Sequence, residues 1–436
     1  MYDLIIIGSG WAGFNAAQMA KELNLKVALI ERNKLGGTCL NLGCIPTKAL
    51  IQSAKIFSLA QKAADFGVDN CIPAVNFAKI QERKDKIVAA LSLGMQSMLK
   101  GVDFLSGEPR LDSLSQVTVN GSALKTKFIL IATGSSALDF PGMRFDGKKI
   151  ISSDEIIALQ SIPRSLLIVG GGVIGCEFAS LFSMLGTQVT VVEKTPRLLP
   201  LEDAEISKRI EGIFKKKGIK VACSTEAAAF NVSDFELVLI AVGRKPQCNI
   251  PGLSQAGVRL ERGAVLVDDY LKAGPQNIYA AGDCTAKLML AHFAGYQGRL
   301  AVENMFSSAP RKMRLDNVPN CIFTDPEVAS VGLSEETAAS SNVEVKAVRL
   351  DFMGLGMARV LGETQGFIKI ICGRKDDRVL GACIVGPKAT EIIGALSVAV
   401  SAGMTTEGLR RVIFAHPTIS ESVAEALNQA DYGGKQ

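Results

Sequence analysis

The amino-acid sequence predicts an α/β protein built from two copies of one β-α-β pattern and a C-terminal α+β domain. The first copy, DLIIIGSGWAGFNAAQMAKELNLKVALIERN, begins at residue 3 and aligns without a gap on SLLIVGGGVIGCEFASLFSMLGTQVTVVEKT, which begins at residue 165. The offset is 162 residues throughout. Beyond residue 313, strand-like runs precede helical stretches at 388–403 and 419–430. A chain of 436 residues is typical of two to four domains.

Each copy contains a glycine-rich turn between a strand-like run and a stretch with helical spacing. In the pattern G-x-G-x-x-G, the first glycine permits a tight turn, the second lets the backbone approach a pyrophosphate, and the third lets helix and strand pack closely. The free helix N-terminus favours the anionic diphosphate. The sequence therefore predicts two Rossmann-like dinucleotide-binding sites, one at Gly8, Gly10 and Gly13 and the other at Gly170, Gly172 and Gly175.

An acidic residue follows each turn at the same distance. Glu31 and Glu193 both lie 23 positions after the first glycine of their copy, at the end of the second predicted strand. A carboxylate there can accept hydrogen bonds from both hydroxyls of an adenosine ribose and repels a 2′-phosphate. Each site is therefore predicted to prefer an unphosphorylated ribose, and the two sites together suggest one flavin and one nicotinamide dinucleotide.

Further apolar runs have the pattern of buried strands. Two follow the glycine copies, KFILIATGSS from residue 127 and FELVLIAVGRKP from residue 235, and a third, NIYAAGDC, begins at residue 277. In the C-terminal part, GFIKIICG and RVLGACIVG are strand candidates ahead of the two helical stretches.

The composition of the chain limits its expected cellular location and its expected binding partners. Hydrophobic residues make up 48% of the chain and charged residues 21%, and no apolar run is long enough to cross a bilayer. The N-terminal run lacks the basic region and cleavage site of a signal peptide, so a cytoplasmic location is expected. The net charge of +5 is spread along the chain, so neither a nucleic-acid partner nor a membrane is expected. With two histidines and no C-x-x-C pair, no metal site is expected.

Two of the ten cysteines, Cys39 and Cys44, stand apart in the run GGTCLNLGCIP. A disulfide needs Cα atoms roughly 4.4 to 6.8 Å apart, whereas residues five apart on a regular helix are about 8 to 9 Å apart. The segment must therefore be tighter than a regular helix, and Gly43 and Pro46 suit such a departure. The spacing alone supports two interpretations equally. The pair is either a redox centre that stores two electrons or two unpaired structural thiols.

Taken together, the motifs resemble one family. From the N-terminus onward they are CLNLGC, LIATGS, GGGVIGCEFAS, VGRKP, IYAAGDC, MLAH, FTDPEVASVG and HPTISE. In these motifs the chain is similar to the pyridine nucleotide-disulfide oxidoreductases, most closely to their dihydrolipoamide dehydrogenase branch. The resemblance implies a flavoprotein that oxidises protein-bound dihydrolipoyl groups to lipoyl disulfide, with electrons passing from the cysteine pair through FAD to NAD.

The resemblance also implies roles for individual residues. Cys39 would form the mixed disulfide with substrate and Cys44 would face the flavin, with Lys48 and Glu177 as an ion pair beside the reactive edge of the flavin. The implied FAD site comprises Gly8, Gly10, Gly13, Glu31, Thr38, Gly107, Thr133, Gly134, Asp283, Met289, Ala291 and His292, where His292 has a structural or backbone-level role. The implied NAD site comprises Gly170, Gly172, Gly175, Glu193 and Gly243.

An acid–base pair is implied near the C-terminus. His416 and Glu421, the outer residues of HPTISE, match the family's dyad, which serves the active site of the other subunit of a homodimer. An imidazole is well suited to take the proton of an attacking thiol near neutral pH. The implied partners are the lipoyl domains of 2-oxo acid dehydrogenase or glycine cleavage complexes.

The resemblance divides the chain into domains. It implies an FAD-binding domain formed by residues 1–142 and 263–313, an NAD-binding domain at 143–262 and a dimerisation domain at 314–436. The segment near 222–236 is shorter than the family usually has, so part of a small antiparallel meander over the adenine side of NAD would be missing. Ala227 stands where a larger apolar residue is usual.

Two alternatives remain from the sequence. One is another NAD(P)H-dependent disulfide reductase, although Glu193 disfavours NADPH and the chain has no cysteine after residue 383, where some reductases carry an extra redox pair. The other is a non-catalytic flavoprotein sensor or binding module, for which loss of Cys39, Cys44 or His416 would be expected.

Overall fold

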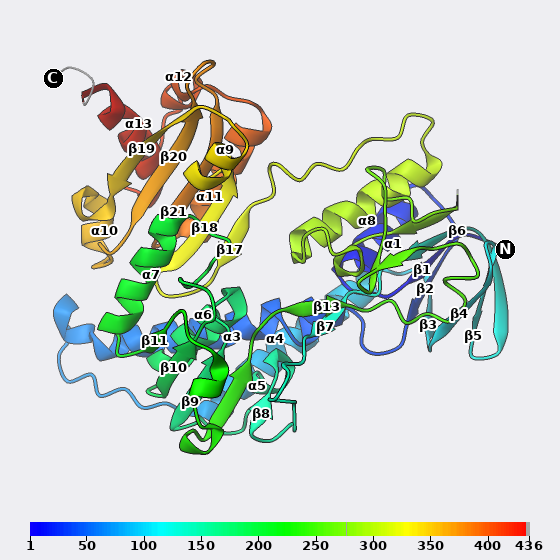
Figure 1. Ribbon diagram of the computed structural model, residues 1–436, viewed down its shortest axis with the longest axis horizontal. Coiled ribbons are helices and arrows are strands. Elements are labelled where there is room, and N and C mark those ends of the chain that lie inside the picture. Colours follow the sequence, from blue (N-terminus) through cyan, green and yellow to red (C-terminus); the bar gives the residue numbers. More distant parts are fainter. Residues whose placement is uncertain (276, 433–436) are drawn as a thin grey trace.

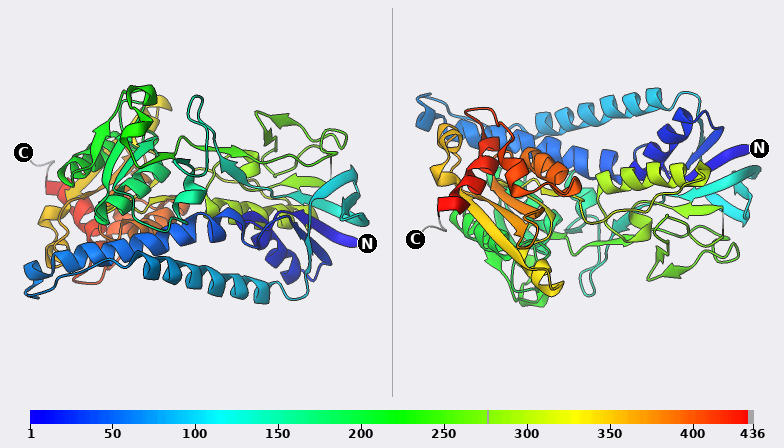
Figure 2. Two further views of the ribbon diagram at one scale, coloured as in Figure 1. Left: turned by 90° about the horizontal axis from the view of Figure 1, so that it is seen from below. Right: turned by 90° about the horizontal axis from the view of Figure 1, so that it is seen from above.

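The computed structural model describes residues 1–275 and 277–432. Three large sheets dominate it (Figure 1), and strand β1 (Tyr2–Ile7) and helix α13 (Ser422–Tyr432) lie at opposite ends of the molecule. Helices α3 (Cys44–Gln61) and α4 (Phe77–Met98) run along one side of the molecule in both views of Figure 2, from the first sheet towards the far end. No helix in the described residues is long and apolar enough to span a membrane.

The first sheet contains the first glycine copy. Five parallel strands run in the order β3-β2-β1-β6-β16, and β4 and β5 extend β6 as an antiparallel meander. The strands are β1 (Tyr2–Ile7), β2 (Val27–Glu31), β3 (Asp103–Ser106), β4 (Pro109–Ser113), β5 (Gln116–Val119), β6 (Ser122–Ile131) and β16 (Ile278–Ala280). Helix α1 (Trp11–Glu22) crosses α8 (Ala291–Phe306) so closely that a Cβ at Gly298 would lie 2.1 Å from the Ala12 carbonyl oxygen.

The second sheet is parallel throughout, in the order β11-β10-β9-β12-β8. Its strands are β8 (Ile150–Ile151), β9 (Ser165–Val169), β10 (Gln188–Val192), β11 (Lys220–Ala222) and β12 (Leu237–Ile240), with helices α5 (Ser153–Ile156), α6 (Val173–Met184) and α7 (Ala204–Lys216). Helices α1 and α6 are offset by 162 residues at both ends, which confirms the predicted repeat.

Short elements connect these two sheets. Strand β7 (Ser135–Ala137) pairs with β13 (Arg244–Pro246), and β14 (Leu260–Glu261) pairs with β15 (Ala264–Val265). Between β11 and β12, the fully described segment 223–236 contains two 3₁₀ turns, η2 (Ala227–Ala229) and η3 (Val232–Asp234), and no strand. The absence of a strand here agrees with the expectation that part of the small antiparallel meander is missing.

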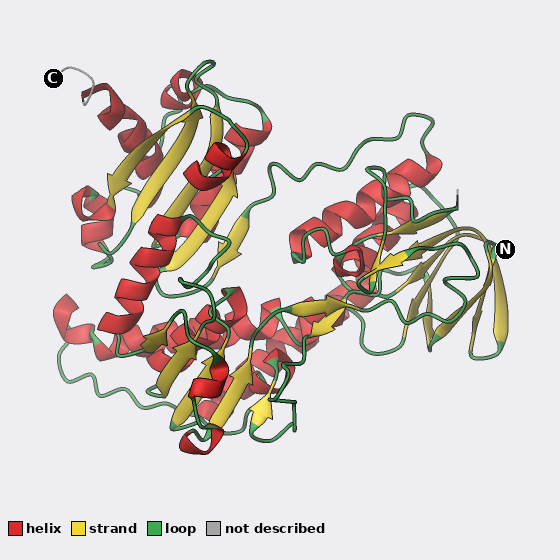
Figure 3. Ribbon diagram, in the orientation of Figure 1, coloured by secondary structure: helices red, strands yellow, loops and turns green. Residues whose placement is uncertain are grey.

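The third sheet is antiparallel, in the order β17-β18-β21-β20-β19 (Figure 3). Its strands are β17 (Asn320–Ile322), β18 (Glu327–Gly332), β19 (Val345–Asp351), β20 (Phe367–Gly373) and β21 (Val379–Gly386). The helices around it are α9 (Glu335–Ser340), α10 (Gly356–Val360), α11 (Ala389–Ser401), α12 (Thr406–Arg410) and α13 (Ser422–Tyr432). Strands β20 and β21 and helices α11 and α13 coincide with the predicted runs, so the predicted fold class is confirmed.

One apolar core joins α3, the second sheet and the third sheet. It includes Leu50 of α3, Phe182 of α6, Ile322 of β17 and Phe367 of β20, all at most 2% exposed. Since α3 begins at Cys44, this core fixes the helix of the second cysteine against residues of the second and third sheet regions.

Candidate functional site

The two glycine turns have the same geometry. Gly8 and Gly170 adopt φ values of +101° and +109°, which favour glycine. A Cβ on Gly13 would lie 1.8 Å from the Gly8 carbonyl oxygen, and one on Gly175 would lie 1.9 Å from that of Gly170. By contrast, a Cβ on Gly10 or Gly172 would meet no atom within 4 Å. Each turn therefore leaves open space at the N-terminus of α1 or α6, which fits a dinucleotide diphosphate.

The two acidic residues also brace the turns. Glu31 accepts hydrogen bonds from Ser9 N–H at 2.8 Å and Ser9 Oγ at 2.7 Å, and Glu193 accepts them from Gly171 N–H at 2.6 Å and Thr195 N–H at 2.7 Å. Both carboxylates are buried. Glu31 also accepts a hydrogen bond from Asn33 N–H at 2.8 Å. A carboxylate has about four acceptor positions, so Glu31 retains about one and Glu193 about two for ribose hydroxyls. The sequence did not predict this bracing role.

The other residues expected at the FAD lie around the ends of the first sheet's strands. Gly107 N–H, after β3, donates to the Glu31 carbonyl at 2.9 Å. Thr133 and Gly134 follow β6, and the adjacent Ser135 hydroxyl donates to Asp283 Oδ2, after β16, at 2.5 Å. A Cβ on Gly8 would lie 3.2 Å from the Thr133 Cα, so the loop after β6 lies against the first glycine turn.

The MLAH run lies at the start of α8, which begins at Ala291, two residues after Met289. His292 Nε2 lies 2.8 Å from the Pro319 carbonyl, and partial desolvation lowers the pKa of this imidazole. A neutral ring that donates Nε2–H to a carbonyl is consistent with the structural role expected for His292.

The cysteine pair lies at a break between two helices. Cys39 belongs to α2 (Gly37–Asn41) and Cys44 is the first residue of α3, and between them Leu42 and Gly43 have φ values of −135° and −141°. The expected departure from regular helix is confirmed at Gly43. Pro46 does not contribute to it, because it lies inside the first turn of α3, where a proline is tolerated.

The redox segment rests on the first glycine turn. Gly36 N–H donates to the Ser9 carbonyl at 3.0 Å, and a Cβ on Gly37 would lie 2.7 Å from the Gly10 Cα. Thr38 follows directly in α2, and its carbonyl accepts a hydrogen bond from Leu42 N–H at 2.8 Å. Thus the segment that carries Cys39 lies directly against the first glycine turn, where a dinucleotide diphosphate is expected to bind.

The two cysteines are free thiols whose side chains interact. The hydrogen bond from Cys39 lowers the pKa of Cys44 to about 7, and the nearby Lys48 cation acts in the same direction against the effect of burial. The same hydrogen bond, together with burial, raises the pKa of Cys39. Cys44, at a helix N-terminus, is therefore the thiol that ionises first.

Lys48 and Glu177 form an ion pair one turn along α3 from Cys44. Lys48 Nζ lies 2.9 Å and 2.8 Å from the two carboxylate oxygens of Glu177 on α6. The ring centroid of Phe323 lies 4.6 Å from the same Nζ atom. The sequence did not predict the contact with Phe323; FTDPEVASVG was recognised only as a family motif.

His416 and Glu421 also lie together. His416 Nδ1 is 2.7 Å from Glu421 Oε1. Among the described residues, neither makes a hydrogen bond or ion pair with the cysteines. The folded chain therefore assembles the dyad and the cysteine pair as two separate groups.

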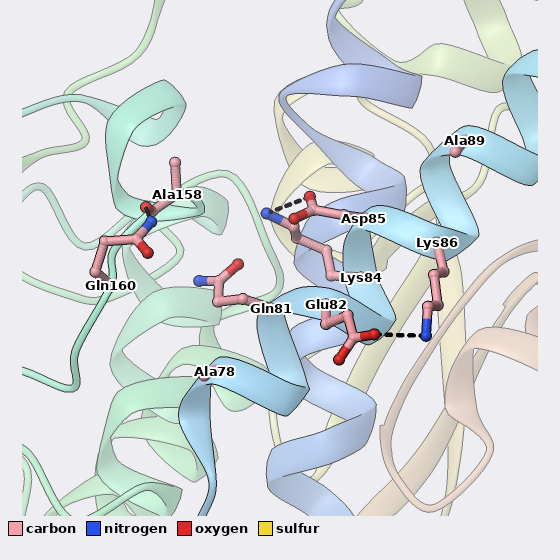
Figure 4. Close-up of a pocket in the computed structure, with 9 residues that line it drawn as sticks. All are labelled: Ala78, Gln81, Glu82, Lys84, Asp85, Lys86, Ala89, Ala158 and Gln160. Carbon is pink, nitrogen blue, oxygen red and sulfur yellow. Dashed lines mark hydrogen bonds and ion pairs between the residues drawn. The ribbon is translucent and has the colours of Figure 1, made fainter.

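A surface hollow lies between α4 and the loop after α5 (Figure 4). Its charged side chains pair with one another, Lys84 with Asp85 at 2.9 Å and Lys86 with Glu82 at 2.6 Å. Because these groups are already paired and the hollow contains no cysteine or histidine, it is not a candidate for the redox chemistry.

Comparisons with known proteins agree with this geometry. The family model described as pyridine nucleotide-disulphide oxidoreductase matches residues 2–298, and the model of that family's dimerisation domain matches residues 318–427. Dihydrolipoyl dehydrogenase from Bacillus subtilis (strain 168) is 37% identical over 99% of this chain and 98% of its own length. The same-named protein of Chlorobaculum parvum is 37% identical over 98% of this chain and 96% of its own length.

Two solved structures share the whole fold. LpdA from Mycobacterium tuberculosis superposes with a TM-score of 0.91 and 28% identity, over 98% of this chain and 99% of that chain. The HOCl-induced flavoprotein disulfide reductase RclA from Escherichia coli superposes with a TM-score of 0.87 and 30% identity, over the same shares.

Proposed function

The chain belongs to the pyridine nucleotide-disulphide oxidoreductase family, and from this premise we propose that it oxidises protein-bound dihydrolipoyl groups through Cys39 and Cys44, with NAD as the final electron acceptor. It is a flavoprotein disulfide oxidoreductase, and its cofactors are FAD and NAD. The observation that carries the proposal is the pair of free thiols at the break between α2 and α3, Cys39 and Cys44, on a segment that packs directly on a dinucleotide-type glycine turn.

Each glycine turn would hold one cofactor. FAD would lie on the first turn, with its adenosine ribose at Glu31 and the rest of the molecule along Thr38, Thr133, Gly134 and Asp283. NAD would lie on the second turn, with its ribose at Glu193. Bound FAD supplies the two-electron chemistry that links the thiol pair to NAD. The protein supplies the positions of the thiols, the ion pair beside them and the acid–base dyad.

The thiol chemistry begins with Cys39 and Cys44 joined as a disulfide. The partner subunit's His416 takes a proton from one dihydrolipoyl thiol, and the resulting thiolate attacks Cys39 Sγ. The Cys39–Cys44 bond breaks, and Cys44 leaves as a thiolate, which its low pKa favours. The second substrate thiol then attacks the substrate sulfur bound to Cys39, closes the lipoyl disulfide and transfers its proton to Cys39. Two electrons have moved from substrate to the cysteine pair.

Two subunits are required by this scheme. Residues 318–427 match a dimerisation domain, and the dyad is separate from the cysteine pair within one chain. A homodimer would place His416 of one subunit at Cys39 of the other. We expect the enzyme to act in the cytoplasm on lipoyl domains of 2-oxo acid dehydrogenase or glycine cleavage complexes, the partners that its resemblance to dihydrolipoyl dehydrogenases implies.

The test is anaerobic reduction of the purified, FAD-loaded protein by dihydrolipoamide, followed by addition of NAD. A long-wavelength thiolate–flavin absorbance band and then NADH are expected. Cys44→Ser should retain FAD and lose both signals, whereas Cys71→Ser, which changes an exposed thiol elsewhere, should retain them. If NADPH reduces the flavin while dihydrolipoamide does not, the substrate is another disulfide and the proposal is wrong.

A further inference from the structure

A short segment of the third sheet reaches the ion pair beside the cysteines. It follows β17 and consists of Phe323, Thr324 and Asp325. Phe323 N–H donates to Glu177 Oε1 at 2.9 Å, and Asp325 N–H donates to Ser180 Oγ at 3.0 Å. Glu177 and Ser180 lie on α6, about one turn apart. The segment is therefore fixed at two points on the helix that carries the carboxylate.

The side chain of Phe323 meets the other member of the ion pair. Lys48 Nζ lies 4.6 Å from the ring centroid, within the distance at which a cation is attracted by an aromatic face. The ammonium group is thus held by the Glu177 carboxylate and by the Phe323 ring. Phe323 therefore contacts both members of the ion pair. Its backbone N–H donates to Glu177, and its ring lies against Lys48.

Lys48 is the more exposed member of the ion pair. Its side chain is 30% exposed, whereas that of Glu177 is 6% exposed. The two charges have opposite effects on Cys44, because Lys48 lowers the pKa of its thiol and Glu177 raises it. If Lys48 moved away, the remaining carboxylate would disfavour the thiolate.

We propose that Phe323 is a positioning residue for the redox pair: its aromatic face and its N–H keep Lys48 beside Glu177 and close to Cys44. This inference rests on the proposed function of Cys39 and Cys44. It also assigns the dimerisation domain a role inside its own subunit, since Phe323 lies within the residues that match that domain.

A packing role would give different results from a positioning role. Phe323 is a partly buried residue at the edge of the core that includes Ile322 and Phe367. If Phe323 only fills space, any apolar side chain of similar size serves. If its aromatic face holds Lys48, tyrosine replaces phenylalanine and leucine does not, because leucine has no negative π face.

The experiment compares FAD-loaded wild type, Phe323→Leu and Phe323→Tyr. Each is reduced anaerobically with two electrons per FAD from dithionite, which does not require the proposed substrate, and the thiolate–flavin band is recorded between pH 5 and pH 9. FAD content and the thermal unfolding midpoint are measured in parallel to confirm folding. Phe323→Met is the second apolar variant and replaces Phe323→Leu if that variant does not bind FAD.

We expect the pH midpoint of the band to rise by roughly half a unit or more in Phe323→Leu, because loss of a nearby cation raises a thiol pKa. Phe323→Tyr should keep the wild-type midpoint. In a Lys48→Met background, Phe323→Leu should cause no additional shift, because the two residues act through the same contact.

The possible outcomes separate the two proposals. A wild-type protein without the band at any pH overturns the proposed redox pair, and the role of Phe323 with it. A wild-type band whose midpoint is unchanged in Phe323→Leu overturns the role of Phe323 alone. Equal shifts in the leucine and tyrosine variants, or an undiminished leucine effect in the Lys48→Met background, also overturn it.

Discussion

His416 Nδ1 lies 2.7 Å from Glu421 Oε1, with the imidazole side chain 81% exposed and the carboxylate 18% exposed. Thr418 N–H donates to the second oxygen of the same carboxylate at 2.8 Å. The hydrogen bonds from Thr418 and His416 lower the pKa of Glu421, so this carboxyl group stays ionised at neutral pH. The exposed imidazole is therefore oriented by a fixed anion, and its free edge is accessible to a second subunit.

The dyad predicts a selective loss of activity in Glu421→Gln. The amide cannot stabilise an imidazolium as the carboxylate does, so kcat with dihydrolipoamide should fall on the order of tenfold to a hundredfold. FAD content and dimer formation should be unchanged. The control is Glu407→Gln, which alters an exposed carboxylate of α12 that pairs with Arg411 at 3.1 Å. Wild-type turnover in Glu421→Gln would contradict the assigned role.

Lys48→Met should make Cys44 harder to ionise. Lys48 lowers the pKa of Cys44, which is about 7, so removal of the cation raises that pKa and shifts the thiolate to more alkaline solution. In the reduced protein, alkylation of Cys44 by iodoacetamide at pH 7 should slow by roughly tenfold or more. Mass spectrometry of the Cys44 peptide between pH 5 and pH 10 measures this shift.

The matched control is Lys55→Met. Lys55 lies on the same helix and pairs with Glu327 at 3.1 Å, and it is not among the causes of the Cys44 pKa. Its replacement should leave the alkylation profile unchanged. A profile that moves equally in both variants would show a general effect on α3 instead of a specific one from Lys48.

Two glycine substitutions should separate the cofactor sites. Gly10→Ala and Gly172→Ala both place a Cβ where no protein atom lies within 4 Å, so both variants should fold. The new methyl group would occupy the space for a diphosphate, so Gly10→Ala should be purified with little FAD. Gly172→Ala should retain FAD and bind NAD more weakly. Flavin absorbance and the KM for NAD measure the two effects; FAD loss in Gly172→Ala would reverse the assignment.

The third glycine of each turn should behave differently. A Cβ on Gly13 would lie 1.8 Å from a backbone oxygen, so Gly13→Ala cannot be accommodated without movement of the turn. We expect it to lower the free energy of unfolding by about 3 kcal/mol or more, as severe overpacking does. Urea denaturation of Gly13→Ala beside Gly10→Ala tests this contrast. Equal stability of the two would contradict the close packing of α1 on its turn.

Glu193→Arg should alter the choice of nicotinamide dinucleotide. A cation at this position attracts a 2′-phosphate that the carboxylate repels, so the ratio of kcat/KM for NADP to that for NAD should rise by about tenfold or more. Because Glu193 also braces Gly171 and Thr195, some loss of stability is expected in addition. Glu226→Arg, at an exposed carboxylate paired with Lys194, is the control. An unchanged ratio in Glu193→Arg would contradict the ribose role.

Much of the architecture was predictable because its signals are local. The apolar runs, the glycine spacing and the helical periodicity lie within about thirty residues of one another in each βαβ unit, and the strands and helices formed where these patterns predicted them. The C-terminal strands β20 and β21 and helix α11 were predictable for the same reason. The domain boundaries and the individual cofactor contacts remain predictions.

By itself, the sequence determined the repeated βαβ unit, the glycine positions that a turn requires, and the presence of a cysteine pair, a histidine and carboxylates in recognisable motifs. Only the tertiary structure decided how these groups meet. Lys48 and Glu177 are 129 positions apart, and their ion pair and the Phe323 ring against it depend on the core shared by α3, α6 and the third sheet. Local periodicity sets secondary structure, whereas contacts between distant segments depend on how whole sheets and helices pack.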